Sequence, residues 1–174
     1  MNKTRYIALS AILAALVVIC LAVISIIPVN TLSLYVLSSF FISIIVVEFG
    51  HKHAWLFFAV SSLLGTAIVP NKAVMVPYIF FFGIYGLVKY YIELANKMIV
   101  EIPVKLVFFN ICAYLVYLLA RGFAVQSINF DSNVKTLPII VIIVILNMAF
   151  MAYDYTYSLF VHYYQNKIKP KIRF

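Results

Sequence analysis

The residues best placed for chemistry are two tyrosines and an arginine near the end of one apolar run. Tyr114, Tyr117 and Arg121 are spaced i, i+3 and i+7, so in a helix they share one face. Tyr78 directly follows a proline in another apolar run, and Asn71 lies in the polar stretch before it. Aromatic walls with one cation and a few amides suit a small planar or anionic ligand. An interfacial aromatic belt with a snorkelling arginine is the structural alternative.

Two amides and one carboxylate lie deep inside runs that are otherwise apolar. Asn110 and Asn147 each need a partner helix or a cavity, because an unpaired amide in hydrocarbon costs several kcal/mol. Bonding between helices and ligand binding both remain open for them. Asp154 lies further along the run that holds Asn147, and Lys89 and Lys105 at comparable depth are its expected ion-pair partners. For Lys105, snorkelling outward from the start of its helix is also possible.

The predicted substrate-binding set combines three tyrosines, the arginine and two amides. It consists of Tyr78, Tyr114, Tyr117, Arg121, Asn147 and Asn71.

Catalytic signatures are absent from the sequence. It contains no His-Glu-x-x-His, no Gly-x-Ser-x-Gly and no glycine-rich phosphate loop. His51 and His53 lack further metal ligands nearby, and Cys20 and Cys112 lie within apolar runs, where neither a disulfide nor a metal site follows. We therefore expect a chain that is not an enzyme and that holds no metal and no cofactor.

The composition is that of a membrane protein. Of 174 residues, 66% are hydrophobic and 10% are charged, whereas soluble domains carry about 25% charged residues. The mean hydropathy is +1.10. The net charge of +8 comes from basic residues that lie almost wholly between and beyond the apolar runs. Membrane orientation and anionic lipid headgroups explain these charges better than nucleic acid does.

Six apolar runs are separated by short polar breaks. Roughly twenty apolar residues cross a bilayer core at 1.5 Å rise per residue. The fourth run contains Pro77, Gly83 and Gly86, which predict an irregular beginning and close packing further on. We predict an all-α integral membrane protein, a six-transmembrane-helix bundle forming a single domain over residues 1–174. The expected spans are 6–27, 32–47, 54–69, 73–91, 103–120 and 137–160.

The positive charges predict the orientation of these spans. With the N-terminus in the cytoplasm, Lys72, Arg121 and Lys135 are outside, and the other ten of the 13 Lys and Arg residues are inside. An even number of spans returns the C-terminus to the cytoplasm. Glu93 is then expected at the inner interface, exposed to solvent. The prediction is an N-in, C-in protein of the bacterial plasma membrane.

The first run carries small residues at helical spacing on one side, with Ala8, Ala11 and Ala15 prominent among them. A small-x-x-x-small face allows close approach of another helix. Together with the six short spans, the orientation and the longest outer loop before the sixth span, Ala11-x-x-x-Ala15 resembles the docking face of S-components. These are the substrate-binding membrane subunits of energy-coupling factor (ECF) type micronutrient importers.

This resemblance implies a function and a set of partners. The chain is expected to capture a vitamin or related small micronutrient from outside and to dock through Ala8, Ala11 and Ala15 on a transmembrane coupling protein. Two separate ATPase subunits then hydrolyse ATP, and no ATP site is expected here. In that family the S-component is thought to topple within the membrane as it docks. No vitamin-specific motif identifies the substrate.

A different class of protein has a similar layout. Six spans also resemble the MreD-type cell-shape proteins, which are membrane scaffolds that bind proteins and transport nothing. Such a scaffold predicts an interior filled by side chains, whereas an S-component predicts a ligand-sized cavity opening outward between the fourth, fifth and sixth spans.

Overall fold

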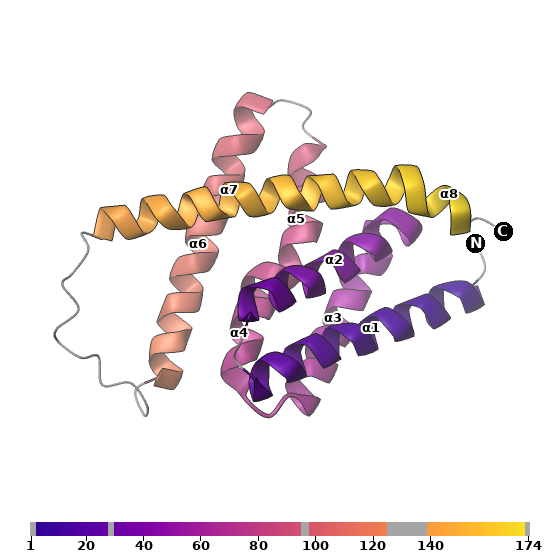
Figure 1. Ribbon diagram of the computed structural model, residues 1–174, viewed down its shortest axis with the longest axis horizontal. Coiled ribbons are helices and arrows are strands. Elements are labelled where there is room, and N and C mark those ends of the chain that lie inside the picture. The colour runs from indigo at the N-terminus through magenta and orange to yellow at the C-terminus, as the bar shows by residue number, and fades with distance from the viewer. Residues whose placement is uncertain (1–2, 28–29, 95–97, 125–138, 173–174) are drawn as a thin grey trace.

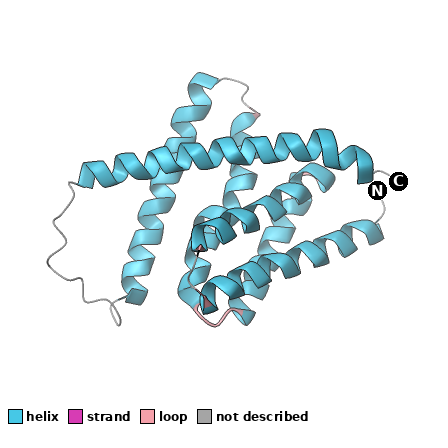
Figure 2. Cartoon of the chain, in the orientation of Figure 1, coloured by secondary structure: helices cyan, strands magenta, loops and turns pink. Residues whose placement is uncertain are grey.

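The computed structural model describes residues 3–27, 30–94, 98–124 and 139–172, and throughout these ranges the regular structure is helical (Figure 2). The long helices are α1 (Lys3–Ile26), α2 (Thr31–Phe49), α3 (His51–Ile68), α5 (Gly83–Glu93), α6 (Met98–Ala124) and α7 (Ile139–Tyr163). Between α3 and α5 lie the 3₁₀ turn η1 (Lys72–Val74), the single turn α4 (Met75–Pro77) and the π-helical turn η2 (Tyr78–Phe82). After α7 the chain continues through the π-helical turn η3 (Tyr164–Ile168) into α8 (Lys169–Ile172).

Helix α2 lies at the centre of the helix packing. It contacts α1, α3, α5, η2 and α7. Ser38, Ser39, Ile42 and Ile45 on this helix are fully buried. Small serine side chains let neighbouring helices approach closely, and Ser38 donates its hydroxyl hydrogen to the carbonyl of Tyr35 at 2.7 Å. Ser39 instead pairs with the hydroxyl of Tyr153 on α7 at 2.6 Å, so the buried serines of α2 bond both within their own helix and to a neighbouring one.

The fourth segment confirms the irregularity predicted around Pro77. Instead of one regular helix, a 3₁₀ turn, an α turn and a π turn precede α5. Proline lacks the backbone N–H that an α-helix uses, and the π turn that follows takes one more residue per turn than an α-helix. Tyr78 lies at the start of this π turn and is fully buried.

Helices α6 and α7 form the periphery. In Figure 1, α7 runs across α5 and α6 rather than alongside them, and the contacts between α6 and α7 are limited to their crossing. Only 11% of the apolar window of each helix is buried. Their exposed side chains are mainly Ile, Val, Leu and Met. Hydrocarbon, rather than water, is the solvent that suits such surfaces.

Five helical segments are long and apolar enough to cross a membrane. They are Tyr6–Ile26, Thr31–Phe49, Lys72–Glu93, Ile99–Leu119 and Val141–Ile168. Each overlaps one of the six predicted spans. The remaining predicted span, 54–69, corresponds to α3, which is not among the five. His51, Lys52 and His53 occupy the first turn of α3 and lower its apolar content.

The breaks between helices are tighter than the sequence predicts. A polar connection was expected between spans 32–47 and 54–69, but only Gly50 separates α2 from α3. Its φ of 83° and ψ of 171° lie in a region that glycine adopts readily and residues with a Cβ rarely adopt. Helix α6 likewise begins at Met98, with Pro103 inside it, rather than at residue 103.

Two ends of the molecule can be distinguished in Figure 1. At one end, here called the α4 end, α1, α3 and α6 finish and α2 and α7 begin. At the other, the α8 end, α1 begins and α2, α5 and α7 finish. The sequence-based orientation puts the α4 end outside and the α8 end in the cytoplasm.

Two helical glycines give a test of this packing. A Cβ at Gly83 would lie 2.6 Å from the Phe58 ring and 2.8 Å from the backbone oxygen of Tyr78. Because a backbone atom of the π turn cannot yield easily, we expect Gly83→Ala to lower the free energy of unfolding by about 1–3 kcal/mol. Chemical denaturation in detergent micelles measures this value.

Gly65→Ala is the matched control. A Cβ there meets the end of the flexible Met75 side chain at 2.7 Å, which can move aside. Both substitutions gain about the same helix propensity, roughly 1 kcal/mol. Equal losses at the two positions would contradict the rigid π turn.

Candidate functional site

A cluster of four charged side chains joins α5, α6 and α7. Asp154 on α7 accepts hydrogen bonds from the Tyr85 hydroxyl at 2.5 Å, from Lys89 Nζ, and from Lys105 Nζ at 3.2 Å. Glu93 Oε1 lies 2.8 Å from Nζ of both lysines. The two ammonium groups and two carboxylates together carry no net charge. Each helix of the peripheral half of the molecule is therefore tied to the others by ion pairs.

Burial makes this cluster costly to disturb. Lys89 and Lys105 are only 4% and 6% exposed, and the Asp154 side chain is 16% exposed. The Glu93 side chain is 42% exposed and reaches the surface at the α8 end. A charge held in low dielectric requires a paired and hydrogen-bonded partner. Lys89 and Lys105 meet that requirement, because each ammonium group pairs with the carboxylates of both Glu93 and Asp154.

The predicted partners of Asp154 are confirmed. Two expectations about its neighbours were wrong. Lys105 does not snorkel outward, because its ammonium group turns inward to Asp154 and Glu93. Glu93 is not explained by solvent exposure alone, since it pairs with both lysines. Helical rise placed Asp154 level with Lys89 and Lys105, as their contacts show, but the face each residue occupies depends on how α5, α6 and α7 cross.

An apolar cavity of about 340 Å³ lies at the α4 end, between α2, α4, η2, α6 and α7. Its volume is in the range of about 300–1,000 Å³ typical of small-molecule sites. Phe109 stacks on Phe150 with ring centroids 4.5 Å apart, and Phe81 meets Phe109 edge to face at 5.4 Å. The aromatic residues that line the cavity are Phe81, Phe82, Phe109, Tyr117, Phe150 and Tyr153.

The chemistry of this cavity follows from its walls. None of the described side chains that line it is charged. The Tyr153 hydroxyl is already paired with Ser39 Oγ at 2.6 Å, whereas Tyr117 is 59% exposed at the rim. Flat aromatic walls favour stacking with a planar molecule. The cavity is suited to a small molecule with an apolar, planar body.

The structure brings only part of the predicted set to this cavity. Tyr117 lines it. Tyr114 is 62% exposed and points elsewhere, and the side chain of Arg121 lies outside the described part of the chain. Tyr78 is fully buried, with its hydroxyl 2.7 Å from Ser61 on α3. Tyr78 therefore stabilises the packing of η2 on α3.

The amides have partners within the protein. Asn110 Nδ2 donates to Asn147 Oδ1 at 2.9 Å, and Asn147 Nδ2 donates to Asn110 Oδ1 at 3.3 Å. This reciprocal pair joins α6 to α7 on a face away from the cavity. Asn71 accepts a hydrogen bond from the N–H of Ala73 at 3.1 Å and so caps η1. Each of the three amides thus has a hydrogen-bond partner within the protein, and none of them lines the aromatic cavity.

The phenylalanines of the cavity were missed by sequence reasoning. Phe81, Phe109 and Phe150 sit in apolar runs, where a phenylalanine facing lipid and one facing a cavity have the same neighbours in sequence. Only the crossing of α6 and α7 over η2 brings the three together. No residue pattern in the sequence distinguishes them.

The small-residue face of α1 borders a groove with α3. Ala8, Ala11 and Ala15 are exposed, whereas Ala14 is buried. The groove measures about 580 Å³ and is lined by Ala11, Ala15 and apolar side chains of both helices. Ala11 and Ala15 thus are not used in packing against the chain's own helices.

Among the residues that the structure describes, no group of three or more His, Cys, Asp or Glu side chains could hold a metal ion. Cys20 and Cys112 are buried free thiols. His53 of α3 is engaged by the end of α2 and by Tyr6: its Nδ1 lies 2.8 Å from the carbonyl of Phe49, and its ring meets that of Tyr6 edge to face.

Neutralising Asp154 tests the charge cluster. Asp154→Asn leaves two buried ammonium groups with the single carboxylate of Glu93, and breaking a buried pair in this way typically costs about 3–5 kcal/mol. We expect a loss of that size in the free energy of unfolding, measured by denaturation in detergent micelles. Glu93→Gln should cost clearly less, because the Glu93 side chain is 42% exposed.

A second variant separates charge from shape. Asp154→Asn combined with Lys105→Met restores electrical neutrality and should recover part of the loss. Equal losses for the single and double variants would mean that the cluster acts through packing and not through charge.

Comparisons with protein-family models, with curated proteins and with solved structures give no match to this chain.

Proposed function

We propose that the chain is the substrate-binding S-component of an ECF-type importer in a bacterial plasma membrane. In this proposal it crosses the membrane six times with both termini in the cytoplasm, α3 forming the third span. The ten-to-three distribution of Lys and Arg supports the orientation. Five segments long and apolar enough to span support the membrane location.

The cavity at the α4 end is the observation that carries the proposal. It opens between the segments that correspond to the fourth, fifth and sixth predicted spans, with α2 behind them. The proposed orientation turns this end outward, where a nutrient is captured. Its aromatic walls favour a vitamin or related micronutrient with a planar apolar body over one that is strongly charged.

The exposed alanines of α1 support the docking part of the proposal. Close helix packing in lipid depends on small residues that let backbones approach. Ala8, Ala11 and Ala15 are exposed along one side of α1 beside an apolar groove. A transmembrane helix of the coupling protein is the proposed occupant, and two ATPase subunits on the cytoplasmic side supply the energy.

The alternative of an MreD-type scaffold predicts an interior filled by side chains. A cavity of about 340 Å³ walled by six aromatic rings does not fit that expectation. The importer is therefore the better supported of the two functions.

Retention of a small molecule tests the binding role. We expect mass spectrometry of the protein extracted gently from its own membranes to find a planar organic molecule. Ala149→Phe places a ring in the cavity, which Ala149 lines, and should abolish retention. Ala152→Phe is the control on the same helix, since Ala152 is exposed and does not line the cavity. Equal retention by both variants, or no retained molecule in the unaltered protein, would argue against the binding role.

Bulky residues on α1 test the docking role separately. Ala11→Trp and Ala15→Trp should keep the fold and the bound molecule but prevent co-purification with a coupling protein and its ATPases. Ala14→Trp, at a position only 5% exposed on the same helix, should instead destabilise the protein. Unfolding of the Ala11 and Ala15 variants would show that these alanines serve the internal core.

A further inference from the structure

Three large exposed side chains form the rim of the aromatic cavity. Leu32 of α2, Tyr117 of α6 and Leu146 of α7 line the cavity and are 68%, 59% and 45% exposed. The lining residues Phe82 and Phe150, in contrast, are buried. The exposed trio, here called the mouth, therefore marks where the cavity opens, and the buried rings form its floor. Two of the mouth residues are leucines, and the third contributes a single phenol hydroxyl.

The mouth lies within the apolar segments of the chain. Its three residues belong to Thr31–Phe49, Ile99–Leu119 and Val141–Ile168, which are long and apolar enough to cross a membrane. Leu146 lies ~8 Å along the helix axis from Val141, where the last of these segments begins. Exposed leucines at such a position are favourable in hydrocarbon and unfavourable in water. The mouth is therefore suited to lipid.

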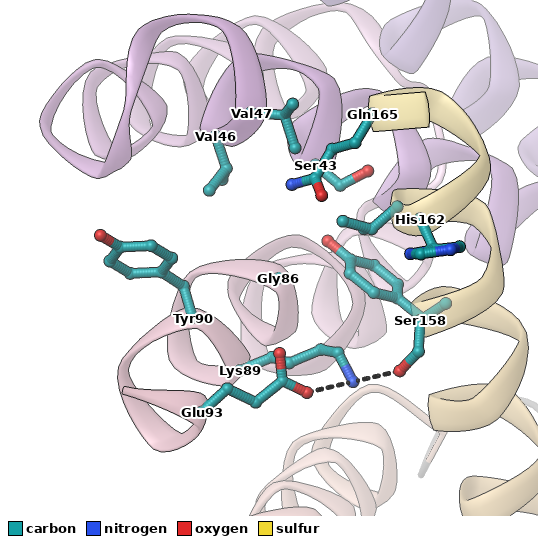
Figure 3. Close-up of a pocket in the computed structure, with 12 residues that line it drawn as sticks. Ser43, Val46, Val47, Gly86, Lys89, Tyr90, Glu93, Ser158, His162 and Gln165 are labelled. Carbon is teal, nitrogen blue, oxygen red and sulfur yellow. Dashed lines mark hydrogen bonds and ion pairs between the residues drawn. The ribbon is translucent and has the colours of Figure 1, made fainter. Parts of the chain in front are cut away.

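The pocket of about 530 Å³ at the α8 end provides a contrast within the same protein. Lys89, Glu93, Ser158, His162 and Gln165 are among the residues that line it (Figure 3). Polar and charged groups of this kind suit an opening to water. Among the described residues that line the aromatic cavity, none is charged and none carries an amide. The two openings are thus built for different solvents.

The interior of the aromatic cavity disfavours a charged ligand. Its floor is made of phenylalanine rings, and the hydroxyl of Tyr153 is already paired with Ser39 at 2.6 Å. An ionised group placed there would lose its hydration without gaining a countercharge from the described lining residues, which is costly. A ligand with a flat neutral body instead stacks on the rings.

We infer that this cavity takes its ligand from the surrounding membrane, through the mouth, and that the ligand is a flat neutral molecule that partitions into lipid. The aromatic floor contacts the body of the ligand, and a polar group on the ligand stays at the mouth beside Tyr117. The inference rests on the binding role proposed for the cavity. It does not depend on the coupling protein or on the direction of transport.

Spin labels on α7 test whether the mouth faces lipid. Labels are attached to Leu146→Cys in the mouth, to Ile145→Cys, which is exposed and does not line the cavity, and to Lys52→Cys, which is exposed in the first turn of α3. Cys20 and Cys112 are replaced by alanine, and the full chain is placed in phosphatidylcholine nanodiscs. Collisions with molecular oxygen report lipid, and collisions with nickel ethylenediaminediacetate report water.

Positions 145 and 146 are neighbours in depth, so they differ mainly in whether they border the cavity. We expect the oxygen-to-nickel ratio at 146 to match that at 145 and to be several times the ratio at 52. A ratio at 146 close to the ratio at 52 would overturn the membrane route.

Two probes of nearly equal shape test the ligand class. At pH 7, 2-naphthol is neutral and 2-naphthoate is an anion. Equilibrium dialysis against the full chain in phosphatidylcholine nanodiscs, with empty nanodiscs as the blank, measures their binding. We expect 2-naphthol to bind at least about tenfold more tightly than 2-naphthoate, because the anion finds no countercharge. Equal binding of the two, or no binding of 2-naphthol above the blank, would overturn the inference.

Two tyrosines of α6 locate the probe. Tyr117 and Tyr114 are 59% and 62% exposed, but only Tyr117 lines the cavity. Tyr117→Ala removes an aromatic wall and should weaken 2-naphthol binding roughly two- to tenfold. Tyr114→Ala is the matched control and should leave the binding unchanged. Equal effects of the two substitutions would place 2-naphthol elsewhere and refute the site.

These measurements separate the inference from the importer proposal. Water-like accessibility at position 146, in a protein that still retains its native molecule, would overturn the membrane route and leave the binding role intact. Lipid-like accessibility with binding of 2-naphthol, in a chain that associates with no coupling protein, would support the inference and count against the importer.

Discussion

The structure depends above all on how it keeps charge inside an apolar interior. Lys89 and Lys105 are almost fully buried, and neither could remain charged there without a carboxylate. Asp154 and Glu93 supply two, and the pairs connect α5, α6 and α7. Helices α6 and α7 bury little apolar surface against the rest of the chain. Apolar packing therefore contributes little to holding the two helices in place, and these ion pairs contribute correspondingly more. In lipid the hydrophobic effect does not drive helices together, so the contribution of the ion pairs is larger still.

Polar side chains are likewise hydrogen-bonded within the protein in α2 and where α6 crosses α7. Ser38 and Ser43 donate their hydroxyl hydrogens to carbonyls of their own helix, and Ser39 pairs with Tyr153 of α7, so close packing leaves none of these three hydroxyls unsatisfied. The reciprocal Asn110–Asn147 pair joins α6 to α7 in the region where few side chains touch.

Sequence reasoning was correct where only the position of a residue along its helix mattered. Counting residues along each run placed Asp154 level with Lys89 and Lys105, and Pro77 correctly marked an irregular segment. It failed where the face of a helix mattered. Tyr78 was expected at a ligand site, but the π turn that begins there departs from the 3.6-residue period and sets it against Ser61. The phenylalanines of the cavity carry no sequence signal, since lipid and a cavity accept the same side chain.

Within about one turn, helix α7 contributes to the aromatic cavity, to the charge cluster and to a second pocket of about 530 Å³ at the α8 end. Tyr153 lines the aromatic cavity, Asp154 holds the charge cluster, and Tyr157 borders the pocket at the α8 end. Tyr85 contacts all three: its ring lies 5.2 Å and 5.7 Å from those of the two tyrosines, and its hydroxyl bonds to Asp154 at 2.5 Å. A molecule passing from one cavity to the other would have to separate these rings and break buried ion pairs. The structure therefore does not favour passage of a molecule between the two cavities. In the proposed importer the substrate would then leave through the opening by which it entered, which is what the proposed movement of the whole subunit in the membrane would allow.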